Sequence, residues 1–422
     1  MTDTPAPETV WAKLGVPRLT GNTKFVGATL IDSVGTGLVL AFTVVYFAKT
    51  TSVPLAVIGL AITTARLLAL PAAVVAGLLI DRFTARRTAT WANLLSVVGY
   101  LGFLLADSVW KIVLVTFLVQ VGHTTYWTSS GGLVVLAAPK DLRTRWFGFL
   151  TALRNTAMGL GGALSAFAFA LGDTDGLRLI VIGNAASYVL AATLLHLWHP
   201  VRADEPPAAD TPPVEAAEPA RGGYATVLRD HAYTVLIGVN TTLVFAQMLI
   251  KVLLAIYIVE ALELDAWIAG VLIVVNTLQV SLTQTLVARQ AERFRPTRVI
   301  MVASLLNALA FGLFALIYTT PDWLTFVGLF VAMVVFTAGE TVGFPPIDTL
   351  SVSMPPDHIR GRYLATYQMS WALGEVAAPA LLTFLLGLGP VLPMLFLLVL
   401  SLLALPLLAN LERRTGLRAA RT

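Results

Sequence analysis

The sequence contains no cysteine and little charge. The absence of Cys from all 422 residues excludes disulfides, thiolate metal sites and cysteine nucleophiles. Asp, Glu, Lys and Arg make up only 12% of the chain, whereas a soluble domain usually carries about 25%. Because 57% of the residues are hydrophobic, the composition excludes a water-exposed globule.

Motifs for nucleotide and zinc chemistry are also missing. The chain has no P-loop, no G-x-G-x-x-G and no H-E-x-x-H, so we expect no cofactor, no metal site and no ATP drive. A membrane-embedded enzyme would need clustered His or Asp ligands, but four of the five His residues lie in loops or at the edges of apolar runs. We therefore expect no enzymatic activity.

Twelve apolar runs are long enough to cross a bilayer as helices, which takes roughly 20 residues each. They cover residues 25–47, 55–80, 88–105, 110–136, 147–171, 177–198, 233–259, 267–287, 299–318, 323–352, 363–388 and 391–408. Residues 1–22 are polar and lack a short apolar core, so we expect no removable signal peptide. The sequence predicts an all-α integral membrane protein.

Basic residues concentrate in alternate connections between these runs. Most of the 28 Lys and Arg residues lie on one side of the predicted membrane, whereas the opposite connections hold Lys49, Lys111, Arg178 and several acids. The positive-inside rule then predicts a multi-pass protein of the inner (cytoplasmic) membrane with both termini in the cytoplasm. Since the net charge of +4 arises from these loops, we expect no nucleic-acid partner.

A segment rich in proline divides the chain into two parts. Residues 199–223 contain six prolines among acidic residues, which is typical of an extended or disordered linker. The predicted organisation is a cytoplasmic segment at 1–24, a six-helix bundle at 25–198, a cytoplasmic linker at 199–223, a second six-helix bundle at 224–410 and a cytoplasmic tail at 411–422.

Two loop motifs occur once in each part. Pro139-Lys-Asp-Leu-Arg143-Thr-Arg145 returns as Pro356-Asp-His-Ile-Arg360-Gly-Arg362 with the same spacing. Asp81-Arg82-Phe83 returns as Glu292-Arg293-Phe294. Duplicated sets of membrane helices are typical of secondary transporters built from two related halves.

The helix count and the loop motifs resemble the major facilitator superfamily over essentially the whole chain. Residues 77–87 resemble the family's loop 2–3 signature, G-x-L-x-D-R-x-G-R-[RK], with Thr84 in place of the glycine and Ala85 in place of a basic residue. The resemblance implies twelve transmembrane helices in two pseudo-symmetric six-helix bundles. It also implies a cytoplasmic gate in which the aspartate pairs with the helix ends and arginines of a neighbouring helix; the gate residues are Gly77, Asp81, Arg82 and Arg86.

Within the superfamily, the chain is most similar to bacterial twelve-helix drug:proton antiporters (MdtH/LmrP-like). The likeness rests on Leu30-Ile31-Asp32, Arg66, Gly339-Glu340 with Pro345-Pro346, and the Arg-Gly-Arg-Tyr run at 360–363. The Gly-rich run at 159–162 lacks the proline of the antiporter signature in helix 5, and the usual helix 4 arginine is absent near Gln120. The resemblance implies proton-coupled export of lipophilic or amphipathic small molecules.

Ionisable residues inside the apolar runs are candidate functional sites, because an unpaired charge in mid-bilayer costs about 2.5 kcal/mol or more. At 1.5 Å per residue, Asp32 lies roughly 15 Å from the cytoplasmic end of its run, and Arg66, Glu340 and Glu375 lie roughly 18–21 Å in. We expect Glu340, Asp32 and Glu375 to be proton-coupling sites. Asp32 and Arg66 are expected to form a buried pair, which either transmits the coupling or only fixes helix 1 against helix 2.

Other polar residues in the runs have weaker assignments. Lys251 is a partner for Glu375 or for an anionic substrate, unless its amine extends to the membrane surface. His123 occupies the repeat position of Glu340 and is either a proton carrier or a packing residue. We expect Asp348 and Arg154, near the cytoplasmic ends of their runs, to be gating or interfacial residues. The candidates for the substrate cavity are His123, Tyr126, Trp127, Phe344, Tyr367 and Trp371.

The sequence thus predicts a monomeric transporter that exports lipophilic or amphipathic small molecules, driven by a proton gradient through alternating access. Its partners would be a small-molecule substrate and the lipid bilayer. Three alternatives stay open, namely an exporter or importer of a single metabolite, a uniporter, and a transport-inactive receptor or scaffold. The substrate, the direction, proton or sodium coupling, and the primary proton carrier are not determined by the sequence.

Overall fold

The computed structural model describes residues 13–39, 42–171, 173–200 and 223–415. Most of the predicted linker and tail, and the first half of the predicted N-terminal segment, lie outside these ranges. In the described part, all regular secondary structure is helical. The helices occur in two sets, one on each side of the linker, as the sequence predicts.

The first set forms six crossings. The first crossing is α2 (Thr23–Val39) followed by α3 (Thr43–Thr50), and the second is α4 (Leu55–Leu68) followed by α5 (Ala72–Phe83). The second crossing breaks at Pro71, the N-cap of α5, because proline cannot donate the backbone hydrogen bond of a continuous helix. The remaining crossings are α6 (Ala85–Phe103), α7 (Val109–Ala137), α8 (Arg143–Leu171) and α9 (Asp173–His196).

The second set repeats this plan after a short helix, α10 (Tyr224–Arg229). Its first crossing combines α11 (His231–Met248) and α12 (Leu254–Ile256) with two π-helical segments, η2 (Leu249–Leu253) and η3 (Tyr257–Ala261). The other crossings are α13 (Trp267–Ala291), α14 (Pro296–Ile317), α15 (Asp322–Ser353), α16 (Arg360–Leu388) and α17 (Leu392–Thr415). Because α17 continues to Thr415, it includes the first residues of the predicted cytoplasmic tail.

Eight helical stretches of the described chain are long and apolar enough to cross a membrane, or nine if the bent pair α2 and α3 counts as one span. The three further crossings, α6, α7 and α8, are 19, 29 and 29 residues long. They pack within the first bundle, α6 against α7 and α9, and α8 against α2. The twelve predicted crossings are therefore all present.

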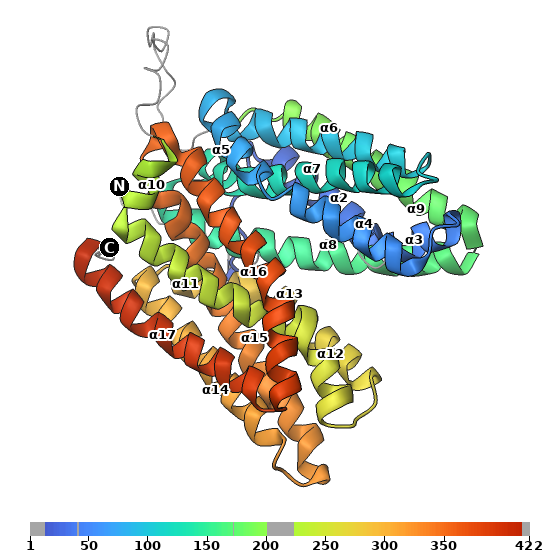
Figure 1. Ribbon diagram of the computed structural model, residues 1–422. Helices are drawn as coiled ribbons and strands as arrows, with labels where there is room; N and C mark the ends of the chain where they lie inside the picture. Colours follow the sequence, from blue (N-terminus) through green and yellow to red (C-terminus); the bar gives the residue numbers. More distant parts are fainter. Residues whose placement is uncertain (1–12, 40–41, 172, 201–222, 416–422) are drawn as a thin grey trace, which may run out of the picture.

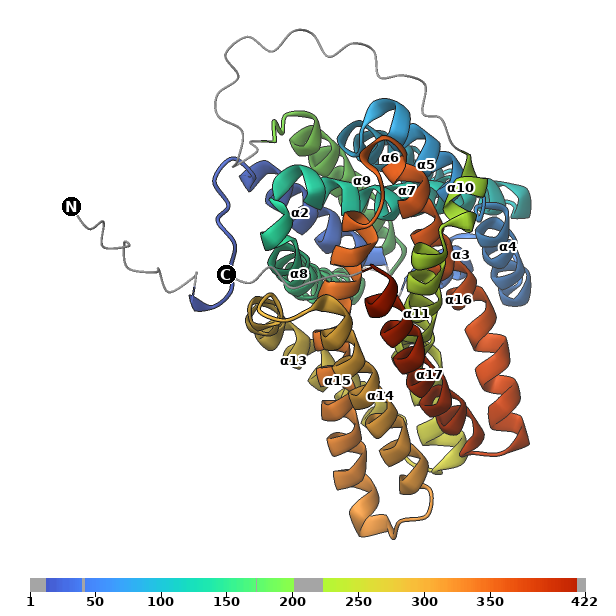
Figure 2. The same ribbon diagram turned by 90° about the vertical axis from the view of Figure 1, so that its left-hand side faces the viewer.

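The two bundles meet at one end and diverge toward the other (Figures 1 and 2). They meet where the connections α5–α6, α7–α8, α13–α14 and α15–α16 lie, and we call this the basic end because these connections carry the repeated arginine motifs. There α5 packs along α16, and α8 packs along α13. The opposite ends of the bundles point away from each other.

The apolar packing agrees with this shape. Of the four buried apolar clusters in the described residues, three lie within one bundle. The fourth joins the bundles, since it includes Val352 and Leu364 of the second together with residues of the first, and both side chains lie next to Gly131 of α7. The hydrophobic connection between the halves is thus confined to the basic end.

Two facing glycines allow the closest approach between the bundles. A Cβ on Gly77 of α5 would lie 2.7 Å from the carbonyl oxygen of Gly361 in α16, and a Cβ on Gly361 would collide with the carbonyl oxygen of Gly77. Carbonyl oxygens of two packed helices cannot yield as a flexible side chain can. A side chain at either position would therefore force α5 and α16 apart.

We expect Gly361→Ala to destabilise this bundle contact by about 1–3 kcal/mol, the usual cost of overpacking. The measurement is thermal unfolding of the purified protein in detergent. Gly159→Ala in α8 is the matched control, because nothing lies within 4 Å of a Cβ built there. Equal melting temperatures for the two variants would show that the glycine contact is not needed.

Candidate functional site

Asp81 lies in the last turn of α5 and contacts the first turn of α16 in the other half. Its Oδ1 accepts a hydrogen bond from the backbone N–H of Gly361 at 2.5 Å, and its Oδ2 lies 3.6 Å from Nε of Arg362. The first turn of a helix has unpaired N–H groups and a partial positive charge, so it attracts a carboxylate. The gate role expected for Asp81 has the matching geometry, with Arg362 as its arginine partner.

The repeat of this motif makes an equivalent contact on the other side. Glu292, directly after α13, accepts a hydrogen bond from the N–H of Arg145 in the first turn of α8 at 3.1 Å. Its second oxygen forms an ion pair with Nη2 of Arg145 at 2.6 Å. Burial raises the pKa of the Glu292 carboxyl above its ordinary value, and Arg145 partly offsets that effect. Both acids therefore bind a helix start and an arginine of the opposite half.

Two other predicted gate residues bind within their own half. Arg86 donates to the carbonyl oxygens of His196 and Trp198 at the end of α9. The Arg82 guanidinium lies over the Phe83 ring, 5.2 Å from its centroid. Thr84, which replaces the signature glycine, has φ of 92°, a conformation that favours glycine. The turn of the family motif is thus kept with a strained residue.

Arg66 does not pair with Asp32, in contrast to the prediction. Asp32 is buried at 7% exposure, and its Oδ1 has no hydrogen-bond partner. Arg66 is exposed, and no ion pair joins it to an acid of the described chain. The reason is the helix arrangement, because α2 packs on α8 and α9 while α4 packs on α7. The two side chains belong to different interfaces.

Arg154 of α8 is the cation whose charge acts on Asp32. It acts in the same way on Asp348 of α15, in the other half. Its guanidinium is half-buried and lies over the Trp127 ring, 4.6 Å from the centroid. Arg154 is thus a basic residue whose charge reaches a buried acid in each bundle, Asp32 in the first and Asp348 in the second.

Arg154 lies in the first half of α8. Because α8 begins at Arg143 rather than at residue 147, Arg154 lies roughly 16 Å along the helix at 1.5 Å per residue. The two copies of the proline motif have the same local structure. Each forms one 3₁₀ turn, and a helix then begins at its first arginine. These turns are η1 (Lys140–Leu142) and η4 (Asp357–Ile359).

Glu340 of α15 is held by neutral groups. Its Oε2 accepts a hydrogen bond from Nδ2 of Asn276 in α13 at 2.7 Å, and Asn276 also donates to Thr337 Oγ1 at 3.0 Å. Gln247 of α11 is a further hydrogen-bond partner. Neither amide is among the predicted site residues, although an Asn and a Gln within apolar runs are a usable signal. No ion pair neutralises Glu340 among the described residues.

Lys251 and Glu375 form an ion pair, which is one of the two partners expected for Lys251. Nζ of Lys251 lies 2.6 Å from Oε1 of Glu375, and the two side chains are 47% and 50% exposed. Lys251 lies in the π-helical segment η2, and π-helical turns are frequent at functional sites. Its amine is 5.6 Å from the ring centroid of Trp371, which in turn contacts Phe344 at 5.5 Å.

The remaining cavity candidates divide into two kinds. Tyr126 and Tyr367 are buried, and Tyr367 donates a hydrogen bond to Asp348 at 2.7 Å. His123 and Trp127 are partly exposed, and Trp127 donates to His123 at 2.9 Å. The charges of Glu375 and Lys251 act on His123 across the two halves. The predicted residues therefore form two facing clusters, one in each bundle.

Comparison with known proteins agrees with this architecture. The family model of the Major Facilitator Superfamily matches residues 25–250 and 236–420. The chain belongs to the Major Facilitator Superfamily (MFS). As an MFS protein it is a multi-pass membrane transporter, and it is not an enzyme. The two facing clusters are thus the candidate transport site.

Individual MFS relatives are distant. A Na(+), Li(+), K(+)/H(+) antiporter of Planococcus maritimus is 24% identical over 372 residues, which are 81% of this chain and 84% of the relative. A bacterial homologue of the iron transporter ferroportin has a crystal structure in an outward-facing state. Its TM-score is 0.72 at 15% identity, and the match covers 93% of this chain and 99% of the homologue. The proton:xylose symporter XylE has a TM-score of 0.67 at 16% identity, with 92% and 96% covered. At these identities the solved structures establish the fold alone.

We expect Glu292→Gln to open the basic end of this MFS protein, because it removes the ionic partner of Arg145. A hydrogen bond to a charged group contributes about 1.5–3 kcal/mol, so the population of the closed form relative to the open form should fall at least about tenfold. Since the chain has no cysteine, Val352→Cys can report on opening, because Val352 is fully buried between the halves. Labelling of this reporter by a membrane-permeant maleimide should accelerate in the Gln variant.

Glu263→Gln is the matched control, since Glu263 is an exposed acid between η3 and α13, away from the basic end. It should leave the labelling rate of the Val352→Cys reporter unchanged. Equal labelling in the Glu292 variant and the control would remove the Glu292 contact from the closure of the basic end.

Proposed function

We propose that the protein is a proton-coupled antiporter of the cytoplasmic membrane that exports lipophilic or amphipathic small molecules by alternating access. The carrying observation is the environment of Glu340, an acid within a membrane helix that is hydrogen-bonded to neutral amides; the charge of Lys251 also acts on it, but no ion pair joins the two in the described chain. A carboxylate without a fixed counter-ion is costly in a membrane. A bound proton is the simplest way to neutralise this carboxylate. Release of the proton restores the free-energy cost of the charge in the membrane.

The basic end lies in the cytoplasm in this proposal, following the positive-inside rule. The described conformation is then closed to the cytoplasm and faces outward. The Asp81 and Glu292 contacts hold this form together, and they must break before the halves can diverge on the cytoplasmic side. Both termini are cytoplasmic, and the chain works as a monomer because each cluster is built within one copy.

The coupling cycle uses the two clusters in turn. Glu340 takes a proton from the outside, and its neutral form relieves the cost of closing the outer side around it. After the halves rearrange, the substrate enters from the cytoplasm or the inner leaflet and favours release of the proton inward. Arg154 transmits the change, because it attracts Asp32 in one half and Asp348 in the other.

The substrate class follows from the side chains around these charges. Trp127, Phe344 and Trp371 are partly exposed and lie next to Arg154, Lys251 or each other. Flat aromatic surfaces beside ionisable groups suit amphipathic molecules with a ring system and a charge. No cofactor takes part in the cycle, since the proton gradient supplies the energy.

A second candidate substrate is an alkali cation. The relative from Planococcus maritimus carries the name of a Na(+), Li(+), K(+)/H(+) antiporter, and the surroundings of Glu340 include the oxygens of Asn276, Thr337 and Gln247. Carboxylate, amide and hydroxyl oxygens are suitable ligands for such ions. Both candidates share the proton-coupling role of Glu340, but an alkali cation would also use its carboxylate as a ligand.

We expect Glu340→Gln to abolish uphill transport driven by a pH gradient while leaving exchange of a lipophilic substrate intact, because Gln keeps the amide contacts but binds no proton. The assay uses proteoliposomes with ethidium as a flat lipophilic cation and, in parallel, Na⁺ or K⁺, with an internal pH dye. Glu263→Gln is the control. Unchanged uphill transport of the active species by Glu340→Gln would exclude Glu340 as the coupling site.

The same assay separates the candidates. Movement of protons in response to ethidium and unrelated aromatic cations supports drug export, whereas a response to Na⁺ or K⁺ alone supports cation exchange. Transport of a single metabolite without proton movement would support a dedicated carrier or a uniporter and would contradict the proposal.

We expect Arg154→Gln to reduce driven transport at least about tenfold, equivalent to about 1.4 kcal/mol, because Asp32 and Asp348 lose their shared cation. Arg154→Lys should recover part of the rate, since it keeps the charge but not the planar stack on Trp127. Melting temperatures of both variants test folding. Equal rates for the Gln variant and the wild type would contradict a role for Arg154 in coupling.

A further inference from the structure

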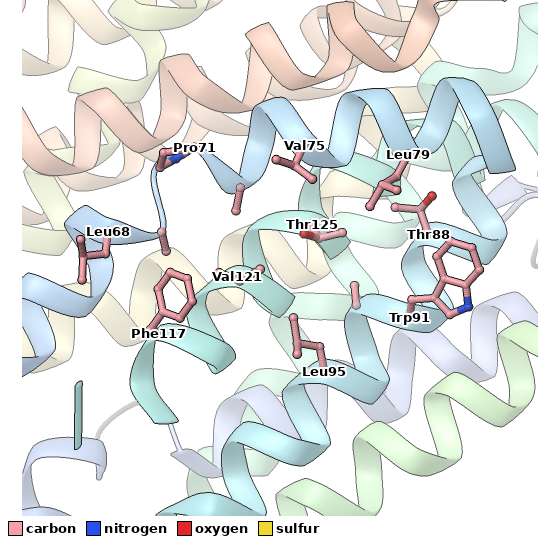
Figure 3. Close-up of a pocket in the computed structure, with 13 residues that line it drawn as sticks. Leu68, Pro71, Val75, Leu79, Thr88, Trp91, Leu95, Phe117, Val121 and Thr125 are labelled. Carbon is pink, nitrogen blue, oxygen red and sulfur yellow. The ribbon is translucent and has the colours of Figure 1, made fainter. Parts of the chain in front are cut away.

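A cavity of about 310 Å³ lies on the first bundle, away from the transport site. It is formed at the break between α4 and α5, against α6 and α7 (Figure 3). Leu68, Val75 and Leu79 point into it from one side, and Leu95 and Phe117 face them (Figure 3). The thirteen lining residues include no charged side chain, so the cavity suits an apolar occupant.

The cavity opens on the outer surface of the bundle. Leu68, Val75 and Trp91 line it and are 58%, 53% and 44% exposed. In a protein that spans the membrane, such a surface faces lipid rather than water. The occupant available at this position is therefore a component of the bilayer.

The side chains at the rim nearest the basic end become less polar toward the interior of the cavity. Arg87, Trp91 and Leu95 follow one another at intervals of four residues along α6, which places them on one face. Going inward from the basic end, this face presents a guanidinium, then an indole, then an aliphatic side chain inside the cavity. Phosphate, ester and acyl chain follow the same order in a phospholipid.

A second cation completes the rim. The Phe83 ring contacts Trp91 edge-on at 5.1 Å, and the Arg82 guanidinium lies over Phe83. Arg82 and Arg87 are exposed, and neither forms an ion pair within the described chain. The indole N–H of Trp91 likewise has no acceptor among the described residues. Two cations and one donor at the mouth of an apolar groove are complementary to an anionic headgroup.

We propose that this groove binds one anionic phospholipid from the leaflet at the basic end. An acyl chain fills the space between α5, α6 and α7. The phosphate binds Arg87 and Arg82, and Trp91 donates to the ester or phosphate oxygens. Basic residues next to a membrane favour anionic lipids by about 1 kcal/mol each, so the site discriminates against a zwitterionic headgroup. The inference is independent of the transported substrate.

The test is native mass spectrometry of the full chain from micelles that contain phosphatidylglycerol or phosphatidylcholine with identical acyl chains. We expect one phosphatidylglycerol per protein and weaker retention of phosphatidylcholine. Val75→Trp fills the groove and should lower phosphatidylglycerol binding at least about fivefold. Arg87→Gln should lower it by about fivefold, equivalent to about 1 kcal/mol, without changing phosphatidylcholine binding.

Matched controls lie elsewhere on the same protein. Val98→Trp in α6 changes a similarly exposed valine, at 58%, that does not line the cavity. Arg293→Gln changes the repeat counterpart of Arg82 on the second bundle. Both should retain phosphatidylglycerol as the wild type does. If Val75→Trp unfolds, which its melting curve would show, Leu95→Phe fills the same groove with a smaller side chain.

Three results would overturn the proposal. In the first, no phosphatidylglycerol is retained by the wild type. In the second, Val75→Trp and Val98→Trp bind it equally. In the third, phosphatidylcholine binds as well as phosphatidylglycerol and Arg87→Gln has no effect, which would make the groove a site for any acyl chain or lipophilic molecule.

Discussion

The described conformation depends on one kind of contact, in which a carboxylate of one bundle binds the first turn of a helix in the opposite bundle. It occurs twice, once through Asp81 and once through Glu292. Each acid accepts from a backbone N–H that no helical carbonyl can satisfy, and each lies near an arginine of the same turn. Because both contacts lie at the basic end, the bundles are joined there and are free to diverge at the other end.

The glycines and the apolar cluster serve the same junction. Gly77 and Gly361 allow α5 and α16 to approach closely enough for Asp81 to reach a backbone N–H. Val352 and Leu364 add the buried apolar area that a polar contact alone lacks. The duplicated loop motifs thus correspond to two equivalent contacts, related by the repeat of the six-helix plan.

The interior charges follow a second pattern. Each bundle supplies acids that are isolated from water by neighbouring helices, and few fixed cations neutralise them. The charge of Arg154 acts on an acid of each half, whereas Glu340 is hydrogen-bonded to amides and has no ion-pair partner in the described chain, although the charge of Lys251 also acts on it. Such an acid is stable only if it can gain or lose a proton as its surroundings change. A transporter that alternates between two forms needs this ability to change protonation state.

The sequence predicted the crossings closely, because apolar runs and loop charges report directly on the membrane. It predicted the Lys251–Glu375 pair as one alternative, since both residues are deep and of opposite charge. It failed for Asp32 and Arg66, because pairing depends on which helix faces which, and hydropathy does not encode that. It also missed the amides around Glu340, which come from other helices, and the lateral groove, which depends on how α4 to α7 pack around the break at Pro71.

The two π-helical segments around Lys251 have a consequence for motion. A π turn holds one residue more than an α turn, and that extra residue can pass to the next turn without displacing either helix end. Each such step rotates the intervening side chains by about 100°, the angle per residue of an α-helix. Lys251 lies inside η2. Movement of the extra residue along this crossing would therefore turn the Lys251 amine away from Glu375 while the surrounding helices stay in place.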